Sequence, residues 1–169
     1  MTPRIMVLGL GNVLNSDDGL GFYAIRDLAR EGWPANVCFV HRTDFEWSPL
    51  FFQDCQGLLL LDAVCQGNEP GTVYTYDIQE LQKHRQCLRT PWILDAIAFS
   101  SLFGEELHTE FVGMEPGCRD CRICLTPAVS CIYWEFLQAA RGKIQTMLDR
   151  VRASAGEGTA QGGVASLAR

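Results

Sequence analysis

The sequence has little positive charge, few histidines and no long apolar run. Its 14 lysines and arginines are outnumbered by 20 aspartates and glutamates, which gives a formal net charge of −6. Nucleic-acid-binding faces are usually basic, so this balance argues against a nucleic-acid partner. No apolar run approaches the about 18 residues needed to cross a membrane, and no basic stretch with an apolar core precedes the first apolar run. We therefore expect a cytoplasmic protein that binds neither nucleic acid nor membrane.

The signatures of nucleotide binding are also incomplete. Gly9-Leu10-Gly11 could begin a dinucleotide fingerprint, but Leu14 stands where the third glycine belongs. Asp17 and Asp18 follow, and their carboxylates would repel a pyrophosphate. The P-loop motif is absent from the sequence. The glycine turn is therefore better explained as part of a cation site than of a phosphate site.

The composition suits one globular domain. The chain has 169 residues, of which 47% are hydrophobic and 20% are charged, and this is enough to bury a substantial core. We assign residues 1–152 to this domain. Residues 153–169 are rich in glycine, alanine and serine, and we expect them to form a disordered tail.

Strand and helix patterns alternate along the chain. They predict strands at residues 4–10, 37–41, 57–64, 72–76 and 109–114, and helices at residues 19–31, 50–54, 92–103 and 127–152. Residues 77–89 fit a loop or a short helix. The unbroken apolar run at 57–64 is typical of a strand buried on both faces, as in parallel sheets. We predict an α/β three-layer sandwich, in which helices cover both faces of a mostly parallel, twisted, five-stranded sheet, with 72–76 as a hairpin partner or edge strand.

Acidic side chains follow the ends of two predicted strands. Asp18 comes shortly after the first strand, and Asp62 lies near the end of the run at 57–64. The carboxyl ends of parallel strands meet at one edge of the sheet, where α/β proteins place their sites. Asp17 or Asp18 could instead cap the next helix. Asp62 needs a cation, hydrogen-bond donors or a metal, because burying an unpaired carboxylate is costly.

Three of the eight cysteines are spaced like metal ligands. Cys118-x-x-Cys121-x-x-Cys124 lies in a loop dense in glycine and proline, and Cys131 follows in the next predicted helix. Thiolates at such gaps hold zinc or an iron–sulfur cluster. The alternative is a loop of reactive thiols followed by one core cysteine. In a cytoplasmic protein, we expect free thiols or ligands in preference to disulfides.

Three blocks of the sequence resemble the [NiFe]-hydrogenase maturation endopeptidases. The first is Val-Leu-Gly-Leu-Gly-Asn-Val-Leu at residues 7–14, followed by Asp17-Asp18-Gly19-Leu20-Gly21. The second is Leu61-Asp62-Ala63 followed by Pro70-Gly71-Thr72, and the third is Val112-Gly113-x-x-Pro116 followed by Leu125-Thr126-Pro127. The resemblance covers about residues 4–150. It implies a cytoplasmic protease that removes a C-terminal extension from the hydrogenase large subunit after nickel insertion.

The resemblance also implies a metal site made by two acids and a histidine. The acids match Asp18 and Asp62, which would contact the nickel of the substrate and position the segment to be cleaved, in a metal-assisted hydrolysis. The histidine has no match. One alignment puts Trp92 in its place, and another puts Arg89 there.

Other residues could complete the implied site. His84, or less readily Cys87, could serve as third ligand, and so could His41 at the end of a neighbouring strand. The segment His41-Arg42-Thr43-Asp44 stands where the family carries an acid followed by small residues, which makes Asp44 a candidate substrate-binding residue.

Two functions are compatible with these patterns. The first is a metal-dependent endopeptidase whose partner is the precursor large subunit of a [NiFe] hydrogenase. The alternative is a non-hydrolytic protein on the same fold, which would act as an assembly checkpoint or use the cysteine loop to sense a metal or redox state. The two functions differ in whether a nickel-loaded precursor loses its C-terminal peptide.

Overall fold

The computed structural model describes residues 4–43, 49–102 and 107–157, and its central element is a five-stranded sheet. The strands are β1 (Arg4–Leu10), β2 (Val37–Arg42), β3 (Cys55–Ala63), β4 (Val73–Asp77) and β5 (His108–Met114). Their order across the sheet is β2-β1-β3-β5-β4. The strands β2, β1, β3 and β5 run parallel to one another. The edge strand β4 pairs antiparallel with β5. The predicted sheet is confirmed, including the edge position of residues 72–76.

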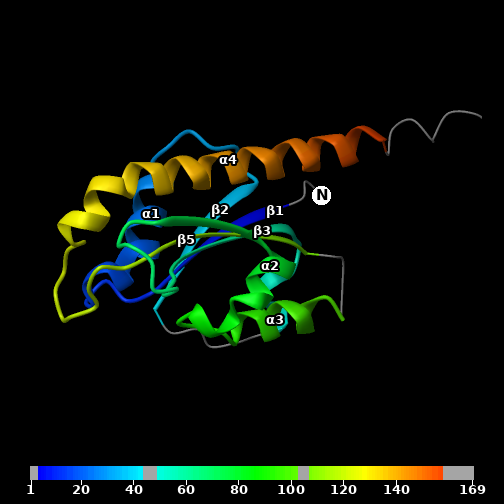
Figure 1. Cartoon of the computed structure of the whole chain (residues 1–169). Coiled ribbons are helices and arrows are strands. Elements are labelled where there is room, and N and C mark those ends of the chain that lie inside the picture. Colours follow the sequence, from blue (N-terminus) through cyan, green and yellow to red (C-terminus); the bar gives the residue numbers. More distant parts are fainter. Residues whose placement is uncertain (1–3, 44–48, 103–106, 158–169) are drawn as a thin grey trace, which may run out of the picture.

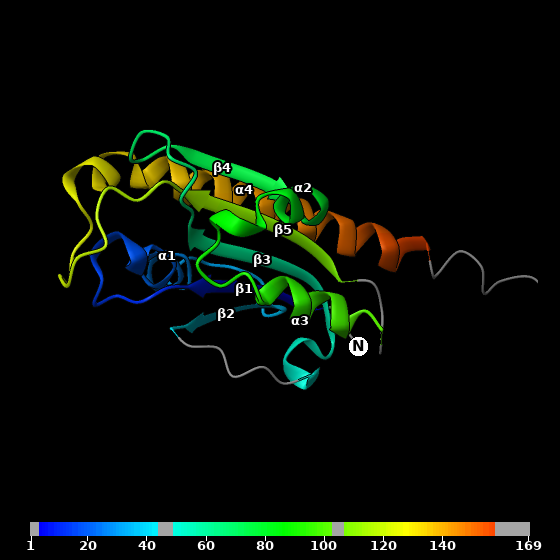
Figure 2. The same ribbon diagram turned by 60° about the horizontal axis from the view of Figure 1, so that its bottom comes forward.

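Helices cover both faces of this sheet, as Figures 1 and 2 show. On one face lie α1 (Leu20–Leu28) and α4 (Pro127–Glu157), and on the other lie α2 (Ile78–Lys83) and α3 (Ile93–Ser100). Three short 3-10 helices, η1 (Ser16–Gly19), η2 (Pro49–Phe52) and η3 (Arg85–Cys87), lie in the connections. The predicted three-layer α/β sandwich is therefore confirmed.

The strand β3 is buried on both faces, as its unbroken apolar run predicts. Leu59 and Leu61 pack into the core beneath α1 and α4, whereas Leu58 and Leu60 pack into the core that contains α3. Successive side chains of a strand point to opposite faces, so one apolar run serves both cores. Asp62 follows directly and therefore sits where this buried strand reaches the edge of the sheet.

The helix α1 approaches β1 very closely. A Cβ atom on Gly21 would lie 2.2 Å from the carbonyl oxygen of Leu10 and 2.7 Å from that of Leu61. Only glycine permits this contact without a backbone shift. The close packing holds η1, which directly precedes α1, against the ends of β1 and β3.

Some helices differ from their predicted bounds. Residues 50–54, predicted as a helix, contain three of the four residues of the 3-10 helix η2 and then a turn, and the open stretch 77–89 contains α2 and η3. The helix α4 continues to Glu157, so residues 153–157 extend it instead of beginning the predicted tail, and alanine at position 153 favours this extension. Residues 158–169 lie outside the described part of the chain. Within that part, no helix combines the length and apolar character required to span a membrane.

Candidate functional site

The two acids predicted from the sequence lie at the same edge of the sheet. Asp62 is near the carboxyl end of β3, which is flanked by β1 and β5. Asp18 belongs to η1, in the connection that follows β1. Gly11 lies next to both, since a Cβ atom there would be 1.9 Å from the Asp18 carbonyl oxygen and 3.7 Å from Asp62 Oδ1. The φ angle of Gly11 is +114°, a conformation that favours glycine, and a side chain here would collide with the backbone of Asp18 and approach the Asp62 carboxylate.

The Asp18 carboxylate is buried, with 1% of the residue exposed. Its Oδ2 accepts a hydrogen bond from the backbone N–H of Asn12 at 3.0 Å and forms an ion pair with Arg89. Its Oδ1 is buried and accepts no hydrogen bond from the described part of the chain. A buried carboxylate oxygen without a donor is costly. Asp18 therefore keeps one anionic oxygen available for a ligand.

The Asp62 carboxylate is equally buried but has no ion pair among the described residues. Its Oδ1 accepts a hydrogen bond from the backbone N–H of Ala63 at 2.8 Å, and Thr90 Oγ1 donates a long hydrogen bond to Oδ2 at 3.5 Å. Burial raises the pKa of Asp62 to about 7, because these two donors offset only part of the desolvation of the charged form. Near neutral pH, Asp62 can therefore hold a proton or bind a cation.

Arg89 supplies the positive charge of the site. It lies in the connection between η3 and α3, and 33% of its side chain is exposed. Burial and the neighbouring charge of Arg119 both lower the pKa of Arg89, but an arginine still remains protonated. Of the two residues that alignment puts in the place of the histidine, Arg89 is thus the one that contacts Asp18, whereas Trp92 directly precedes α3 and its side chain makes no capping hydrogen bond there. From the sequence, Arg89 was only one of two residues that could stand in the place of the histidine.

Neither candidate histidine joins the acids. His41 Nε2 lies 3.0 Å from the carbonyl oxygen of Gly11, and its ring meets Phe22 edge-on at 5.2 Å. His84 stacks on Tyr76 with ring centroids 4.7 Å apart. Among the described residues, no group of three or more His, Cys, Asp or Glu side chains has metal-binding geometry. Asp44, the candidate substrate-binding residue, lies outside those residues.

Asp17 has a structural role that differs from that of its neighbour. Its Oδ2 accepts hydrogen bonds from the backbone N–H groups of Gly117 and Cys118 at 2.8 and 3.0 Å, and from Thr126 Oγ1 at 2.8 Å. Its Oδ1 accepts a hydrogen bond from the Thr126 backbone N–H at 2.6 Å. Asp17 therefore anchors both ends of the cysteine loop beside η1.

The cysteine loop, residues 117–126, does not gather its thiols around a common point. Cys118 is partly exposed, Cys121 and Cys124 are exposed, and all three are free. In the described structure they belong to no group with the geometry of a metal site. Zinc or an iron–sulfur cluster at this loop stays a prediction from the sequence.

The donor set at the acids does not fit a resident divalent ion. A protein-held zinc or nickel ion normally takes three or four donors. Here two buried carboxylates lie at the same edge of the sheet, a guanidinium already pairs with one of them, and the described residues form no group of three ligands. The buried, unpartnered Oδ1 of Asp18 instead suits a cation that arrives with ligands of its own.

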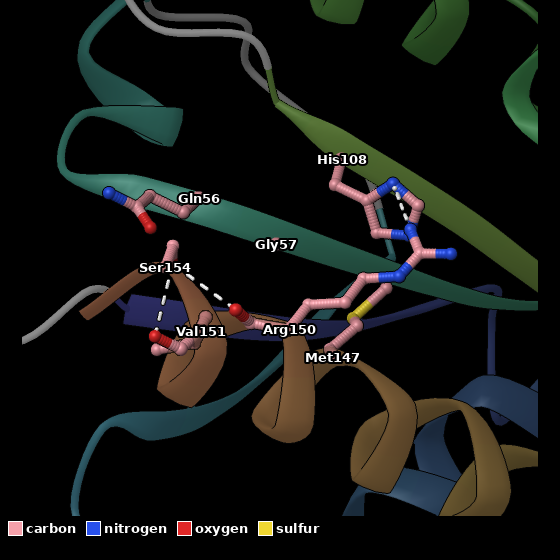
Figure 3. Close-up of a pocket in the computed structure, with 7 residues that line it drawn as sticks. All are labelled: Gln56, Gly57, His108, Met147, Arg150, Val151 and Ser154. Atoms are coloured by element: carbon pink, nitrogen blue, oxygen red, sulfur yellow. Dashed lines mark hydrogen bonds between the residues drawn. The ribbon is translucent and has the colours of Figure 1, made fainter. Parts of the chain in front are cut away.

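A cavity of about 250 Å³ lies at the other end of the sheet, near the starts of β3 and β5. Figure 3 shows its lining residues, with the guanidinium of Arg150 against the ring of His108. Parallel strands begin at one edge and end at the other, so this cavity is remote from Asp18 and Asp62. It therefore forms no part of the acidic site.

In sequence, the chain is similar to proteins named for hydrogenase expression and formation. It is 31% identical over 135 residues to the hydrogenase expression/formation protein HupD of Rhodobacter capsulatus, an alignment that covers 75% of this chain and 64% of the relative. HupD of Bradyrhizobium diazoefficiens is 28% identical over 134 residues, covering 75% and 70%. No protein-family model matches the chain.

In structure, the chain is similar to solved proteins of hydrogenase maturation. The hydrogenase maturating endopeptidase HybD of E. coli has a TM-score of 0.77 to this chain at 23% identity, covering 85% of this chain and 93% of that one. At this identity the likeness establishes the fold alone. In sequence, the chain spans less than two thirds of the length of the Rhodobacter relative.

Proposed function

We propose that the chain is an endopeptidase that removes the C-terminal extension of a [NiFe]-hydrogenase large subunit after nickel insertion. Its sequence similarity to hydrogenase expression/formation proteins and the fold that it shares with a hydrogenase maturating endopeptidase support this proposal. The partner is then the precursor large subunit, and nickel enters the reaction as part of this substrate. We place the reaction in the cytoplasm, in agreement with the prediction from the sequence.

The observation that carries the proposal is the buried pair of acids at the ends of β1 and β3. Asp18 keeps an unpartnered anionic oxygen, and Asp62 has no cationic partner among the described residues. Two carboxylates at a sheet edge suit a cation carried on an incoming peptide segment better than a neutral ligand. In this proposal they contact the nickel of the precursor and hold the adjoining C-terminal segment for hydrolysis.

The local fold favours precise placement of that segment. Asp18 is held by the N–H of Asn12, and Asp62 is held by the N–H of Ala63. Because both carboxylates are fixed before the substrate arrives, little ordering cost remains at the moment of binding. A metal-bound carbonyl is polarised toward attack by water, which is the chemistry that nickel of the precursor would supply.

The direct test is cleavage of a nickel-loaded precursor, followed by mass spectrometry. We expect loss of the C-terminal peptide with the wild-type protein, and a rate lower by about a hundredfold with Asp18→Asn or Asp62→Asn, each of which removes one anionic contact. Asp95→Asn is the matched control, because Asp95 is an exposed carboxylate that pairs with Arg85, and it should cleave at the wild-type rate.

Two outcomes would contradict the proposal. If both acid variants cleave as fast as the wild type, Asp18 and Asp62 are not the site. If the wild type forms a stable complex with the precursor and leaves its mass unchanged, the protein is a binding checkpoint and not a protease. A nickel-free precursor included in the same assay should remain uncut.

A further inference from the structure

A cation of the chain's own already occupies the acidic site. The guanidinium of Arg89 pairs with the buried carboxylate of Asp18. We propose that Arg89 determines the specificity of this site: it holds the place of a metal ion at Asp18, keeps free divalent ions out, and yields to a cation that is delivered by the precursor. The last of these three statements rests on the proposed function, whereas the first two do not.

The pairing satisfies a strong electrostatic demand. Asp18 is only 1% exposed, and its Oδ2 has one neutral donor, the N–H of Asn12. A carboxylate in such surroundings needs a positive partner, and removing that partner leaves an uncompensated buried charge. A divalent ion and a guanidinium would satisfy the same demand, so they compete for Asp18.

The backbone that carries Arg89 is anchored beside the site, while its side chain reaches solvent. Leu88 is buried and forms a bridge with Val64, just beyond the end of β3. The N–H of Cys65 donates a hydrogen bond to the carbonyl oxygen of Cys87 at 3.1 Å. One third of the Arg89 side chain is exposed. The guanidinium can therefore swing outward without any rearrangement of the core.

Free divalent ions face an unfavourable balance of charge and ligands. Arg89 stays protonated across the accessible pH range, and its interaction with Arg119 shows that a second positive charge is close by. A metal ion in solution would have to displace Arg89 and give up its hydration shell for two carboxylates. In the described residues, no third ligand would compensate for this loss.

A cation bound to the precursor meets a different balance. It arrives with its own ligands, and the contacts of the surrounding peptide raise its effective concentration at the site. Asp18 Oδ1, which is buried and unpartnered, can make the first contact while Arg89 still holds Oδ2. The cation can then displace Arg89 from Oδ2 in a second step. A free ion lacks the additional contacts of the peptide, so the site favours the delivered cation over the free one.

The test measures binding of Ni²⁺ alone to the full-length protein by isothermal titration calorimetry. We expect Arg89→Gln to bind Ni²⁺ at least about tenfold more tightly than the wild type, because a like charge within a few ångströms of the site has been removed. Arg89→Lys keeps that charge and should stay within about threefold of the wild type. Arg85→Gln, which breaks the exposed pair with Asp95, should leave the affinity unchanged.

A double variant isolates the acidic site from the thiols of the cysteine loop. Adding Asp18→Asn to Arg89→Gln should remove the gain, and whatever binding remains belongs to other ligands and is subtracted. Circular dichroism checks that each variant is folded. Should Arg89→Gln not fold, Arg89→Leu also removes the charge, adds no metal ligand, and should show the same gain in affinity.

An unchanged or lower Ni²⁺ affinity in the folded Arg89→Gln or Arg89→Leu protein would overturn the proposal, and so would a gain that survives Asp18→Asn. These measurements involve no precursor. A failure to cleave the precursor would therefore refute the proposed function while leaving the exclusion of free ions by Arg89 intact. Normal cleavage without a gain in affinity would refute the role of Arg89 alone.

Discussion

The burial of Asp62 makes a prediction about stability that needs no substrate. In the folded protein, desolvation raises the pKa of Asp62 to about 7, from its ordinary value of 3.8. The folded state therefore binds the proton more tightly than the unfolded state. The contribution of this group to stability is complete below about pH 4 and is lost as the pH rises through 7.

The size of the effect follows from the difference between the two pKa values. Each pH unit in the interval between them changes the free energy of unfolding by about 1.4 kcal/mol. Between pH 5 and pH 8, the wild type crosses about two units of this interval and should lose about 3 kcal/mol through Asp62. Asp62→Asn replaces the carboxyl group by a neutral amide of the same shape, and its Oδ1 can still accept the hydrogen bond from Ala63.

The assay is urea unfolding of the wild type and Asp62→Asn at pH 5 and pH 8. The stability of the variant relative to the wild type should rise by about 3 kcal/mol between the two pH values. Asp120→Asn, at an exposed position, serves as the control and should show no comparable rise. A difference that does not depend on pH would refute the reasoning, because it would mean that Asp62 stays ionised in the folded protein beside an unrecognised cation.

Two further substitutions test how the site is supported. Asp17→Asn replaces an oxygen that accepts hydrogen bonds from the cysteine loop by an NH₂ group, and it should destabilise the protein by about 3 kcal/mol. Limited proteolysis within residues 117–126 should become faster. An unchanged unfolding midpoint would show that these hydrogen bonds do not order the loop. Gly21→Ala places a methyl group 2.2 Å from a backbone oxygen and should lower the stability measured by thermal unfolding by about 2 kcal/mol or more. The control Gly142→Ala has open space around the new methyl group and should raise the stability by about 0.5–1 kcal/mol. Equal effects of the two substitutions would contradict the close packing of α1.

Much of the fold could be predicted from local patterns. The apolar run at 57–64 indicates a strand buried on both faces, and β3 is such a strand because its alternate side chains serve two cores. The position of Asp62 near the end of this run already implied a carboxylate in need of a partner. The helix bounds were less predictable, since the ends of helices depend on weak local preferences and on tertiary contacts.

The tertiary structure decided which side chains meet. Asp17 and Asp18 are adjacent in sequence, yet one anchors a loop about a hundred residues away and the other pairs with Arg89. Local patterns could not distinguish these roles, because hydrogen bonds and ion pairs act through space over a few ångströms and separation along the chain carries no information about them. The same limit explains why the place of the histidine stayed open between Trp92 and Arg89.

The sequence by itself determined the α/β layers and the two acids at the ends of β1 and β3, because hydrophobic periodicity and strand ends are local properties. Only the folded chain brought the guanidinium of Arg89 to Asp18 and gave His41 and His84 other partners, the carbonyl oxygen of Gly11 and the ring of Tyr76. The physical reason is that a buried charge pairs with a group that the packed elements bring close to it in space. Which group this is depends on how the sheet and its connections assemble.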